Sequence, residues 1–247
     1  MYKGKKVVVV LPAYNASQTL ARTYEEIPLD IVDEVILCDD ASKDNTFELA
    51  KKLGIQHCIR HEVNKGYGGN QKTLYKKALE IGADIVIMLH PDYQYTPKLI
   101  PSMVNIIGED LYPVVLGSRI LGKGALKGGM PLYKYLFNRF LTLGQNIIFR
   151  TKLSEYHTGY RAYSKEVLNS IAFEKNSNDF IFDNEILSQI IHKKYGIAEI
   201  TCPTKYFKEA SSINMWRSTI YGLGVMRVSL FYIIQRLGIY TSEIYKK

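Results

Sequence analysis

Residues 7–15 read VVVVLPAYN, an unbroken apolar run that ends in a polar turn. Four consecutive β-branched residues with no polar break are typical of a strand buried on both faces of a sheet. The apolar runs at residues 35–37, 85–89 and 114–116 repeat the pattern, and segments with helical periodicity separate them. This alternation predicts an α/β fold in which helices flank a mostly parallel sheet.

Helix signals accompany the apolar runs. Gly54 and Gly82 are expected to end two helices of the first half. Further helices are expected over residues 131–149, 179–195 and 221–240. The glycine-rich residues 122–129 are expected to form a mobile loop.

The composition excludes several classes of protein. The chain has 247 residues, of which 47% are hydrophobic and 23% charged, as in one folded globular unit rather than a disordered or fibrous chain. Its three cysteines include no CxxC pair, which argues against a disulfide framework and against a zinc site. No apolar stretch approaches the ~20 residues of a spanning helix, and the polar residues after Leu11 interrupt the apolar start too early for a signal peptide. We therefore expect a cytoplasmic protein, attached at most to the cytoplasmic face of a membrane.

The net charge of +8 is concentrated in two segments. Residues 119–152 hold seven basic residues and no acid, and residues 203–247 hold seven basic residues and two acids. Such segments suit nucleotide phosphates, a membrane surface or nucleic acid, and a solvated basic face is the alternative. The helix expected over residues 131–149 is amphipathic, which fits a helix lying in a membrane interface and equally a helix packed on the sheet.

Polar residues follow three of the apolar runs at the point where each run ends. Asn15 follows the first, Asp39 and Asp40 follow the second, and His90 and Asp92 follow the run at residues 85–89. The carboxyl ends of parallel strands meet at one edge of a sheet, where α/β proteins bind their ligands. Carboxylates and an imidazole gathered there can hold a divalent cation, and the cation can neutralise a diphosphate. The alternative is that these residues only form turns and helix caps.

Six segments match, in order and at similar spacing, the motifs of one enzyme family. They are residues 9–15 (VVLPAYN), 37–46 (LCDDASKDNT), 64–70 (NKGYGGN), 90–94 (HPDYQ), 117–119 (GSR) and 158–163 (TGYRAY). The chain thus resembles the inverting nucleotide-sugar glycosyltransferases of the GT-A fold in the large second glycosyltransferase family, in particular the branch of the dolichyl-phosphate mannose and glucose synthases. The resemblance implies a GT-A domain over residues 1–212, followed by a C-terminal helical extension over residues 213–247.

The resemblance also implies roles for residues at the donor site. Asp39 would contact the nucleobase or ribose, and Asp40 would support the pocket. Asp92 would bind the metal and the diphosphate and so serve catalysis, with Gln94 beside it. The further donor contacts would come from Pro12, Ala13, Tyr14, Asn15, Lys65, Gly66 and Asn70.

One position departs from the family pattern. His90 stands where the family usually has the first Asp of its metal motif, so the site has one negative charge fewer. Imidazole suits Mn²⁺ and other transition metals better than it suits Mg²⁺. We expect a divalent metal, Mn²⁺ or Mg²⁺, bound by His90, Asp92 and Gln94.

Candidate residues for the acceptor side come from the second half of the chain. Glu155 lies four residues before Gly159, where relatives often carry an Asp, and Glu185 falls where relatives have a carboxylate facing the acceptor. Both are candidate catalytic groups, although Glu185 could equally be a solvated helix residue. The candidate acceptor-binding residues are Arg119, Arg139, His157, Thr158 and Arg161, the last of which could instead form a surface ion pair.

The expected function is transfer of a sugar, with inversion, from a nucleoside-diphosphate sugar to a membrane-associated acceptor. Arginine forks suit the phosphate of a polyprenyl phosphate. The alternative acceptor is a hydroxyl of a lipid-linked or cell-surface saccharide, which requires a general base. A non-catalytic binding module with a transferase fold is a third hypothesis, supported mainly by His90.

Other classes fit less well. A nucleotidyltransferase would normally carry a glycine-rich loop where residues 12–15 stand, and residues 66–71 lack the third glycine of a dinucleotide-binding motif. We expect no nucleic-acid partner.

Overall fold

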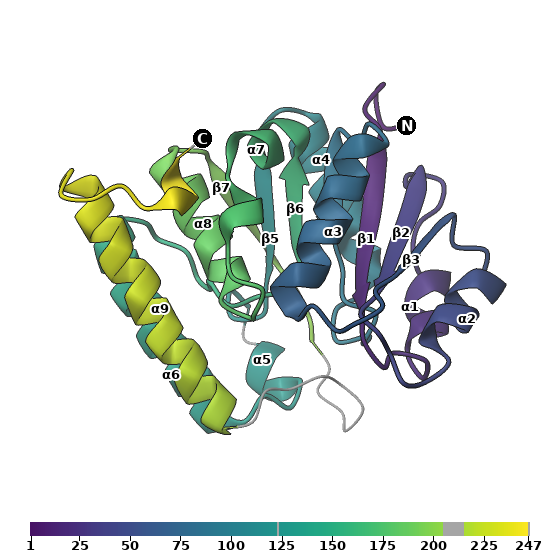
Figure 1. Cartoon of the computed structure of the whole chain (residues 1–247), viewed down its shortest axis with the longest axis horizontal. Coiled ribbons are helices and arrows are strands. Elements are labelled where there is room, and N and C mark those ends of the chain that lie inside the picture. Colours follow the sequence, from purple (N-terminus) through teal and green to yellow (C-terminus); the bar gives the residue numbers. More distant parts are fainter. Residues whose placement is uncertain (123, 205–214, 247) are drawn as a thin grey trace.

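The computed structural model describes residues 1–122, 124–204 and 215–246. At the centre of this part of the chain lies a seven-stranded sheet with the order β3-β2-β1-β4-β6-β5-β7 (Figure 1). Its strands pair in parallel except for β6, which runs antiparallel to both β4 and β5. The expectation of a mostly parallel sheet flanked by helices is therefore confirmed.

The four apolar runs singled out in the sequence all form strands. The short strands β3 and β7 lie at the two edges of the sheet and are half-exposed, so they lack a continuous apolar run. The strands are β1 (Val7–Ala13), β2 (Glu34–Asp39), β3 (His57–Arg60), β4 (Ile85–Met88), β5 (Val114–Ser118), β6 (Arg161–Ser164) and β7 (Ile197–Thr201).

The helices also follow the sequence signals, and Gly54 and Gly82 adopt positive φ angles just beyond the ends of two of them. Part of the loop expected at residues 122–129 is instead a short helix, α5. The helices are α1 (Leu20–Glu25), α2 (Thr46–Lys52), α3 (Tyr67–Glu80), α4 (Ile100–Gly108), α5 (Gly124–Lys127), α6 (Leu132–Phe149), α7 (Lys165–Ser170), α8 (Phe182–His192) and α9 (Met215–Arg236), with 3₁₀ turns at Pro97–Leu99, Phe173–Lys175 and Glu243–Tyr245.

The core consists of one apolar layer on each side of the sheet. Alternate residues of β1 enter opposite layers: Val8 and Val10 pack with residues of α3, α7 and α8, whereas Val7 and Val9 pack with residues of α1, α2 and α4. All four valines have no exposed surface, as the unbroken apolar run predicts. The expected domain boundary at residues 212 and 213 lies outside the described residues and stays a prediction.

The helix α6 turns its polar side toward the protein. Gln145 of α6 and Asn184 of α8 are both buried and exchange two hydrogen bonds between their amides, at 2.9 and 3.0 Å. On the opposite side Phe140 is 72% exposed and Ile147 is 71% exposed. The helix forms where the periodicity predicts it, but this broad apolar face points outward rather than onto the sheet.

The helix α9 lies along α6 at one end of the molecule (Figure 1). The ring of Phe137 closes against Gly222 near the start of both helices, and the rings of Phe149 and Tyr232 are 4.5 Å apart near their ends. The two helices therefore run in the same direction. Within the described residues, none of the helices is both long and apolar enough to cross a membrane.

This packing predicts opposite effects for two substitutions on α6. Gln145→Ala should lower the free energy of unfolding by about 1–3 kcal/mol, because it leaves the buried amide of Asn184 without its partner. Ile147→Ala should change it by less than about 0.5 kcal/mol, because that side chain contacts water. Urea denaturation followed by circular dichroism measures both, and a larger loss for Ile147→Ala would contradict the packing described.

Candidate active site

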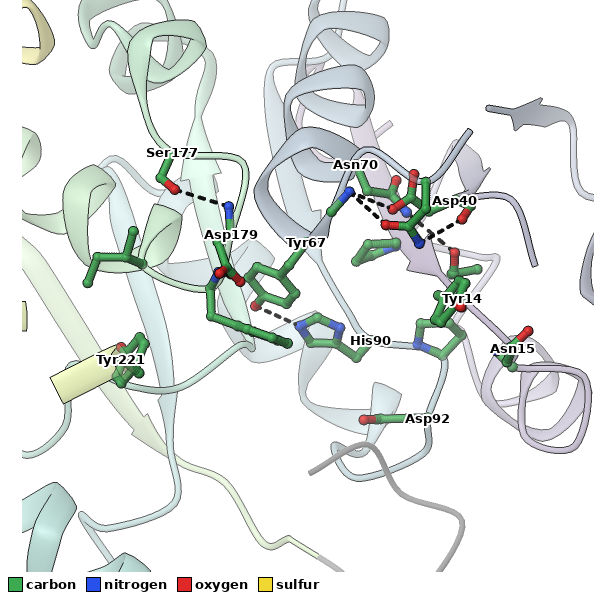
Figure 2. A pocket seen from close by; sticks show the side chains of 18 of the residues that line it. Tyr14, Asn15, Asp40, Tyr67, Asn70, His90, Asp92, Ser177, Asp179 and Tyr221 are labelled. Atoms are coloured by element: carbon green, nitrogen blue, oxygen red, sulfur yellow. Dashed lines mark hydrogen bonds between the residues drawn. The ribbon is translucent and has the colours of Figure 1, made fainter. Parts of the chain in front are cut away.

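A pocket of 670 Å³ opens at the carboxyl ends of β1, β2 and β4. Figure 2 shows His90 and Asp92 between two walls, with Tyr14 and Asn15 on one side and Tyr221 on the other. The lining comprises Pro12 and Ala13 at the end of β1, Tyr14, Asn15, Ala16 and Thr19 after it, Asp40 after β2, Asn64 and Gly66 before α3, Tyr67 and Asn70 in its first turns, His90, Pro91 and Asp92 after β4, Ser177, Asp179, Phe180 and Ile181 before α8, and Ile220, Tyr221 and Gly224 on α9.

The structure thus brings together most of the donor residues expected from the sequence. Asp39 and Lys65 are the exceptions, since neither belongs to the pocket lining. Asp39 is fully buried, with one carboxylate oxygen 3.3 Å from the backbone N of Ser42 and the other 3.3 Å from Nε of Arg60. The backbone N of Lys65 donates a hydrogen bond to Oδ1 of Asp40, which does line the pocket. The contact of Asp39 with a nucleobase or ribose stays a prediction.

Asp40 anchors the start of α3. Its Oδ1 accepts hydrogen bonds from Nδ1 of His61 at 2.7 Å and from the backbone N of Lys65 at 2.8 Å, and its Oδ2 accepts from the backbone N of Gly66 at 2.9 Å. Gly66 has φ 84° and lies so close to Asn178 that an added Cβ would be 2.6 Å from its carbonyl oxygen. Asp40 therefore shapes the pocket wall, and its supporting role toward a bound donor stays a prediction.

Asn70 joins the ends of the first two strands from the first turns of α3. Its Nδ2 donates to the carbonyl of Cys38 at 2.9 Å and to that of Ala13 at 3.4 Å. Its Oδ1 is buried and has no hydrogen-bond partner among the residues that the structure describes. This amide therefore ties the start of α3 to the carboxyl ends of β1 and β2.

His90 belongs to a buried chain of hydrogen bonds. Oη of Tyr67 donates to Oδ2 of Asp183 at 2.6 Å, and Nε2 of His90 lies 3.1 Å from the same Oη. A phenol has one proton, and Tyr67 uses it in the hydrogen bond that it donates to the carboxylate, so Nε2 of His90 carries the proton in the hydrogen bond between His90 and Tyr67. The lone pair of the imidazole then lies on Nδ1.

Burial fixes these protonation states. Desolvation lowers the pKa of His90 and outweighs the opposing effect of Asp92 and Asp183, so the ring is neutral at neutral pH. Desolvation and the carboxylate of Asp183 both raise the pKa of Tyr67 well above its ordinary value, so its proton stays in place.

Arg161 contacts Asp183 at the end of this series of hydrogen bonds. It has no exposed surface, and its guanidinium donates to the carbonyls of Tyr156, Thr158 and Asp183 at 2.8–2.9 Å. Its Nη2 also lies 3.9 Å from Oδ2 of Asp183. A side chain held in this way holds the fold together, and neither the acceptor role expected of Arg161 nor the alternative of a surface ion pair fits its position.

Thr158 and His157 also lie behind the pocket wall. Thr158 is buried and donates to the carbonyl of Gly117 at 2.6 Å. Nδ1 of His157 lies 2.8 Å from Oη of Tyr221, which lines the pocket. Burial lowers the pKa of His157 to about 4, so it supports Tyr221 as a neutral ring. Neither residue contacts the pocket directly.

Glu155 is engaged by Arg119 and Asn138. It accepts hydrogen bonds from the backbone N and Nε of Arg119, both at 2.9 Å, from the Nη2 of that residue, and from Nδ2 of Asn138 at 2.8 Å. Burial alone would raise the pKa of Glu155, but Arg119 outweighs it and holds the pKa below its usual range. Glu155 and Arg119 form a buried ion pair outside the pocket lining. Arg139 is exposed, also lies outside the lining, and donates to the carbonyl of Ser154 at 3.2 Å.

Glu185 stabilises one wall of the pocket without lining it. Its carboxylate accepts from the backbone N of Ser177 at 2.6 Å, at the start of the segment that contributes Asp179, Phe180 and Ile181 to the pocket. Burial raises its pKa. The structure therefore gives Glu185 a positioning role, and the catalytic roles expected of Glu155 and Glu185 stay predictions that this arrangement does not favour.

The residues around Asp92 fit a divalent metal that also binds phosphate. Oδ1 of Asp92 accepts from the backbone N of Gln94 at 3.1 Å, whereas the side chain of Gln94 is buried and does not line the pocket. Among the described residues, no group of three or more His, Cys, Asp or Glu side chains could enclose a metal. A carboxylate and an imidazole lone pair suffice where substrate phosphates and water complete the coordination. The chemistry of the donor set thus fits Asp92 and Nδ1 of His90 as metal ligands.

Sequence reasoning missed several residues of the site. They are Tyr67 on α3, Phe180 just before α8, Asp183 on α8 and Tyr221 on α9. Tyr67 stacks on His90, with ring centroids 5.4 Å apart, and packs against Phe180 at 4.8 Å. Its place in the glycine-rich segment at residues 64–70 was a usable signal, whereas nothing in the sequence indicated Tyr221.

Comparisons with known proteins place the chain in a family. The sequence pattern of Glycosyl transferase family 2 matches residues 8–172. The chain is 29% identical over 218 residues to the UDP-N-acetylglucosamine–dolichyl-phosphate N-acetylglucosaminyltransferase of Methanococcus voltae, covering 82% of this chain and 86% of that protein. It is 28% identical over 204 residues to the dolichyl-phosphate hexose transferase of Haloferax volcanii, covering 82% and 84%.

A solved structure shares the fold. Glucosyl-3-phosphoglycerate synthase of Mycobacterium tuberculosis, crystallised with Mg²⁺ and uridine diphosphate, superposes with a TM-score of 0.72 at 21% identity, over 97% of this chain and 82% of that one. The GT-A fold and the resemblance to the dolichyl-phosphate branch are thus confirmed. Since the family pattern spans well over half of its length, the chain belongs to glycosyl transferase family 2 and is a glycosyltransferase.

Proposed function

We propose that the chain transfers a hexose-type sugar, with inversion, from a nucleoside-diphosphate sugar to the phosphate of a polyprenyl phosphate, and that the transfer requires a divalent metal. The relatives in Methanococcus and Haloferax are by name dolichyl-phosphate transferases, which supports the acceptor class. The related fold crystallised with Mg²⁺ and uridine diphosphate supports the donor and the metal.

The negative charge of the pocket lining is the main reason for proposing a metal. Its described lining contains the carboxylates of Asp40, Asp92 and Asp179 and includes neither Lys nor Arg. A diphosphate placed there would meet negative charge on the protein with no described cation to balance it. A divalent metal on Asp92 and His90 removes this repulsion, and it supplies stabilisation of the negative charge that develops on the leaving nucleotide.

The arrangement of carboxylates supports a phosphate acceptor. A sugar hydroxyl needs a base to remove its proton, but a phosphate monoester has a second pKa near 6 and is already largely dianionic at neutral pH. The two carboxylates expected to act as bases, Glu155 and Glu185, lie outside the pocket lining and are held by other donors. A saccharide hydroxyl as acceptor therefore lacks the base that the sequence suggested for it.

Acceptor specificity tests this proposal most simply. With one labelled donor, polyprenyl phosphate should be glycosylated at least about 100-fold faster than the matching polyprenol, since the alcohol needs a general base. Chromatography of the lipid products measures both rates, and NMR of the product reports whether the anomeric configuration is inverted. Faster transfer to polyprenol or to a free saccharide would refute the phosphate acceptor.

Substitution of the metal carboxylate gives a second prediction. Asp92→Asn should lower the transfer rate by at least about 100-fold at saturating donor, because it removes the only charged metal ligand, while the circular dichroism spectrum stays unchanged. The matched control is Asp179→Asn, which removes another pocket carboxylate but no ligand and should cost less than about tenfold. Equal losses in the two variants would contradict the assignment of the metal to Asp92.

The imidazole gives a third prediction. His90→Asp should shift the ratio of Mn²⁺-supported to Mg²⁺-supported activity toward Mg²⁺, because a carboxylate is the harder ligand. Initial rates in the two metals, for the wild type and the variant, give this ratio. An unchanged ratio would show that His90 does not bind the metal.

A further inference from the structure

We propose that the outward faces of α6 and α9 form one surface that inserts into the interfacial region of a lipid bilayer. The cations of residues 119–152 suggested membrane attachment. In the structure Arg119 is paired with Glu155, so this cation is not available to anionic lipids. The inference instead rests on which side of each helix faces water. Its link to the acceptor rests on the proposed function.

The outward side of α6 is mostly apolar, with the exposed Arg139 beside its apolar stripe. In a helix at the surface of a water-soluble protein the apolar stripe faces the core and the polar residues face solvent. The helix α6 instead exposes an apolar stripe and turns polar side chains inward, beside the buried Leu141 and Phe149. It buries Asn138, Thr142 and Gln145 in hydrogen bonds. The exposed stripe, at spacings of three and four residues, consists of Leu132, Leu136, Phe140, Leu143 and Ile147.

The outward side of α9 continues this stripe. The two helices lie side by side and run in the same direction (Figure 1), and each of them exposes an apolar stripe along its length. More than half of the large apolar side chains that the described residues expose belong to these two helices. Contiguous apolar patches of this kind mark interaction sites rather than ordinary surface. On α9 the exposed large apolar residues are Ile220, Leu223, Met226, Leu230 and Ile233.

The charges beside this surface favour an anionic lipid partner. Neither helix contains an Asp or a Glu, so every charged residue in them is basic. Arg139, Arg227 and Arg236 are exposed. A second copy docked face to face would bring these like charges together, whereas anionic headgroups would neutralise them. Helices with one apolar face and basic flanks suit a position in the plane of the interface.

The surface is continuous with the pocket. Ile220 is 49% exposed on the outward face of α9 and also lines the pocket, together with Gly224 and Tyr221 of the same helix. A lipid with its chain in the bilayer could therefore present its phosphate at the pocket without leaving the membrane. This continuity explains why an apolar surface of this extent lies beside the active site.

Flotation of the full chain with vesicles tests this inference. Wild type should float with phosphatidylcholine vesicles and more strongly with vesicles that also contain phosphatidylglycerol. Phe140→Glu and Leu230→Glu should each lower the partition coefficient by at least about tenfold. The matched control is Leu111→Glu, at a side chain 63% exposed outside the two helices, which should leave binding unchanged. Circular dichroism and urea denaturation check that the variants fold.

Several outcomes would overturn the inference. Wild type could stay out of both vesicle types, or Leu111→Glu could lose as much binding as Phe140→Glu. Light scattering could also show a dimer that Phe140→Glu dissociates, without vesicle binding, which would assign the surface to a second copy. Transfer to a short-chain polyprenyl phosphate in detergent, measured on the same protein, separates the two proposals. Retained transfer without vesicle binding overturns only this inference, and vesicle binding without transfer supports it while overturning the proposed acceptor.

Discussion

A buried arginine and aspartate hold the active site in one arrangement. Arg161 on β6 faces Asp183 on α8, and Asp183 accepts a hydrogen bond from the hydroxyl of Tyr67 on α3. Tyr67 is in turn hydrogen-bonded to His90 after β4. A fully buried guanidinium must keep its partners, since leaving it unpaired costs several kcal/mol. The four elements that meet here therefore cannot shift independently, and the rear of the pocket is fixed before any ligand arrives.

This arrangement also determines what the pocket can bind. The chain of hydrogen bonds leaves the lone pair of His90 on Nδ1, and burial keeps the ring neutral. Together with Asp92 it offers a divalent metal one charged and one neutral ligand. Replacement of the family's first Asp by His90 is then compatible with the proposed metal, because the buried tyrosine orients the imidazole in the way that outer hydrogen bonds orient metal-bound histidines in general.

The sequence was most informative at the ends of the strands. Asp40, His90 and Asp92 could be placed together because parallel strands end at one edge of a sheet. Burial of charged residues was not predictable, since Arg119, Glu155 and Arg161 look like surface residues until tertiary contacts pair them. For the same reason the periodicity of residues 131–149 located α6 but not its inner face, where Gln145 and Asn184 satisfy each other.

Titration calorimetry with uridine diphosphate tests the central claim, that a carboxylate-lined pocket binds a nucleoside diphosphate only through a metal. The account predicts that the dissociation constant in excess Mn²⁺ is at least about 100-fold lower than in chelator, because the pocket's described lining offers no cationic side chain to the diphosphate. Equal affinity with and without Mn²⁺ would contradict it.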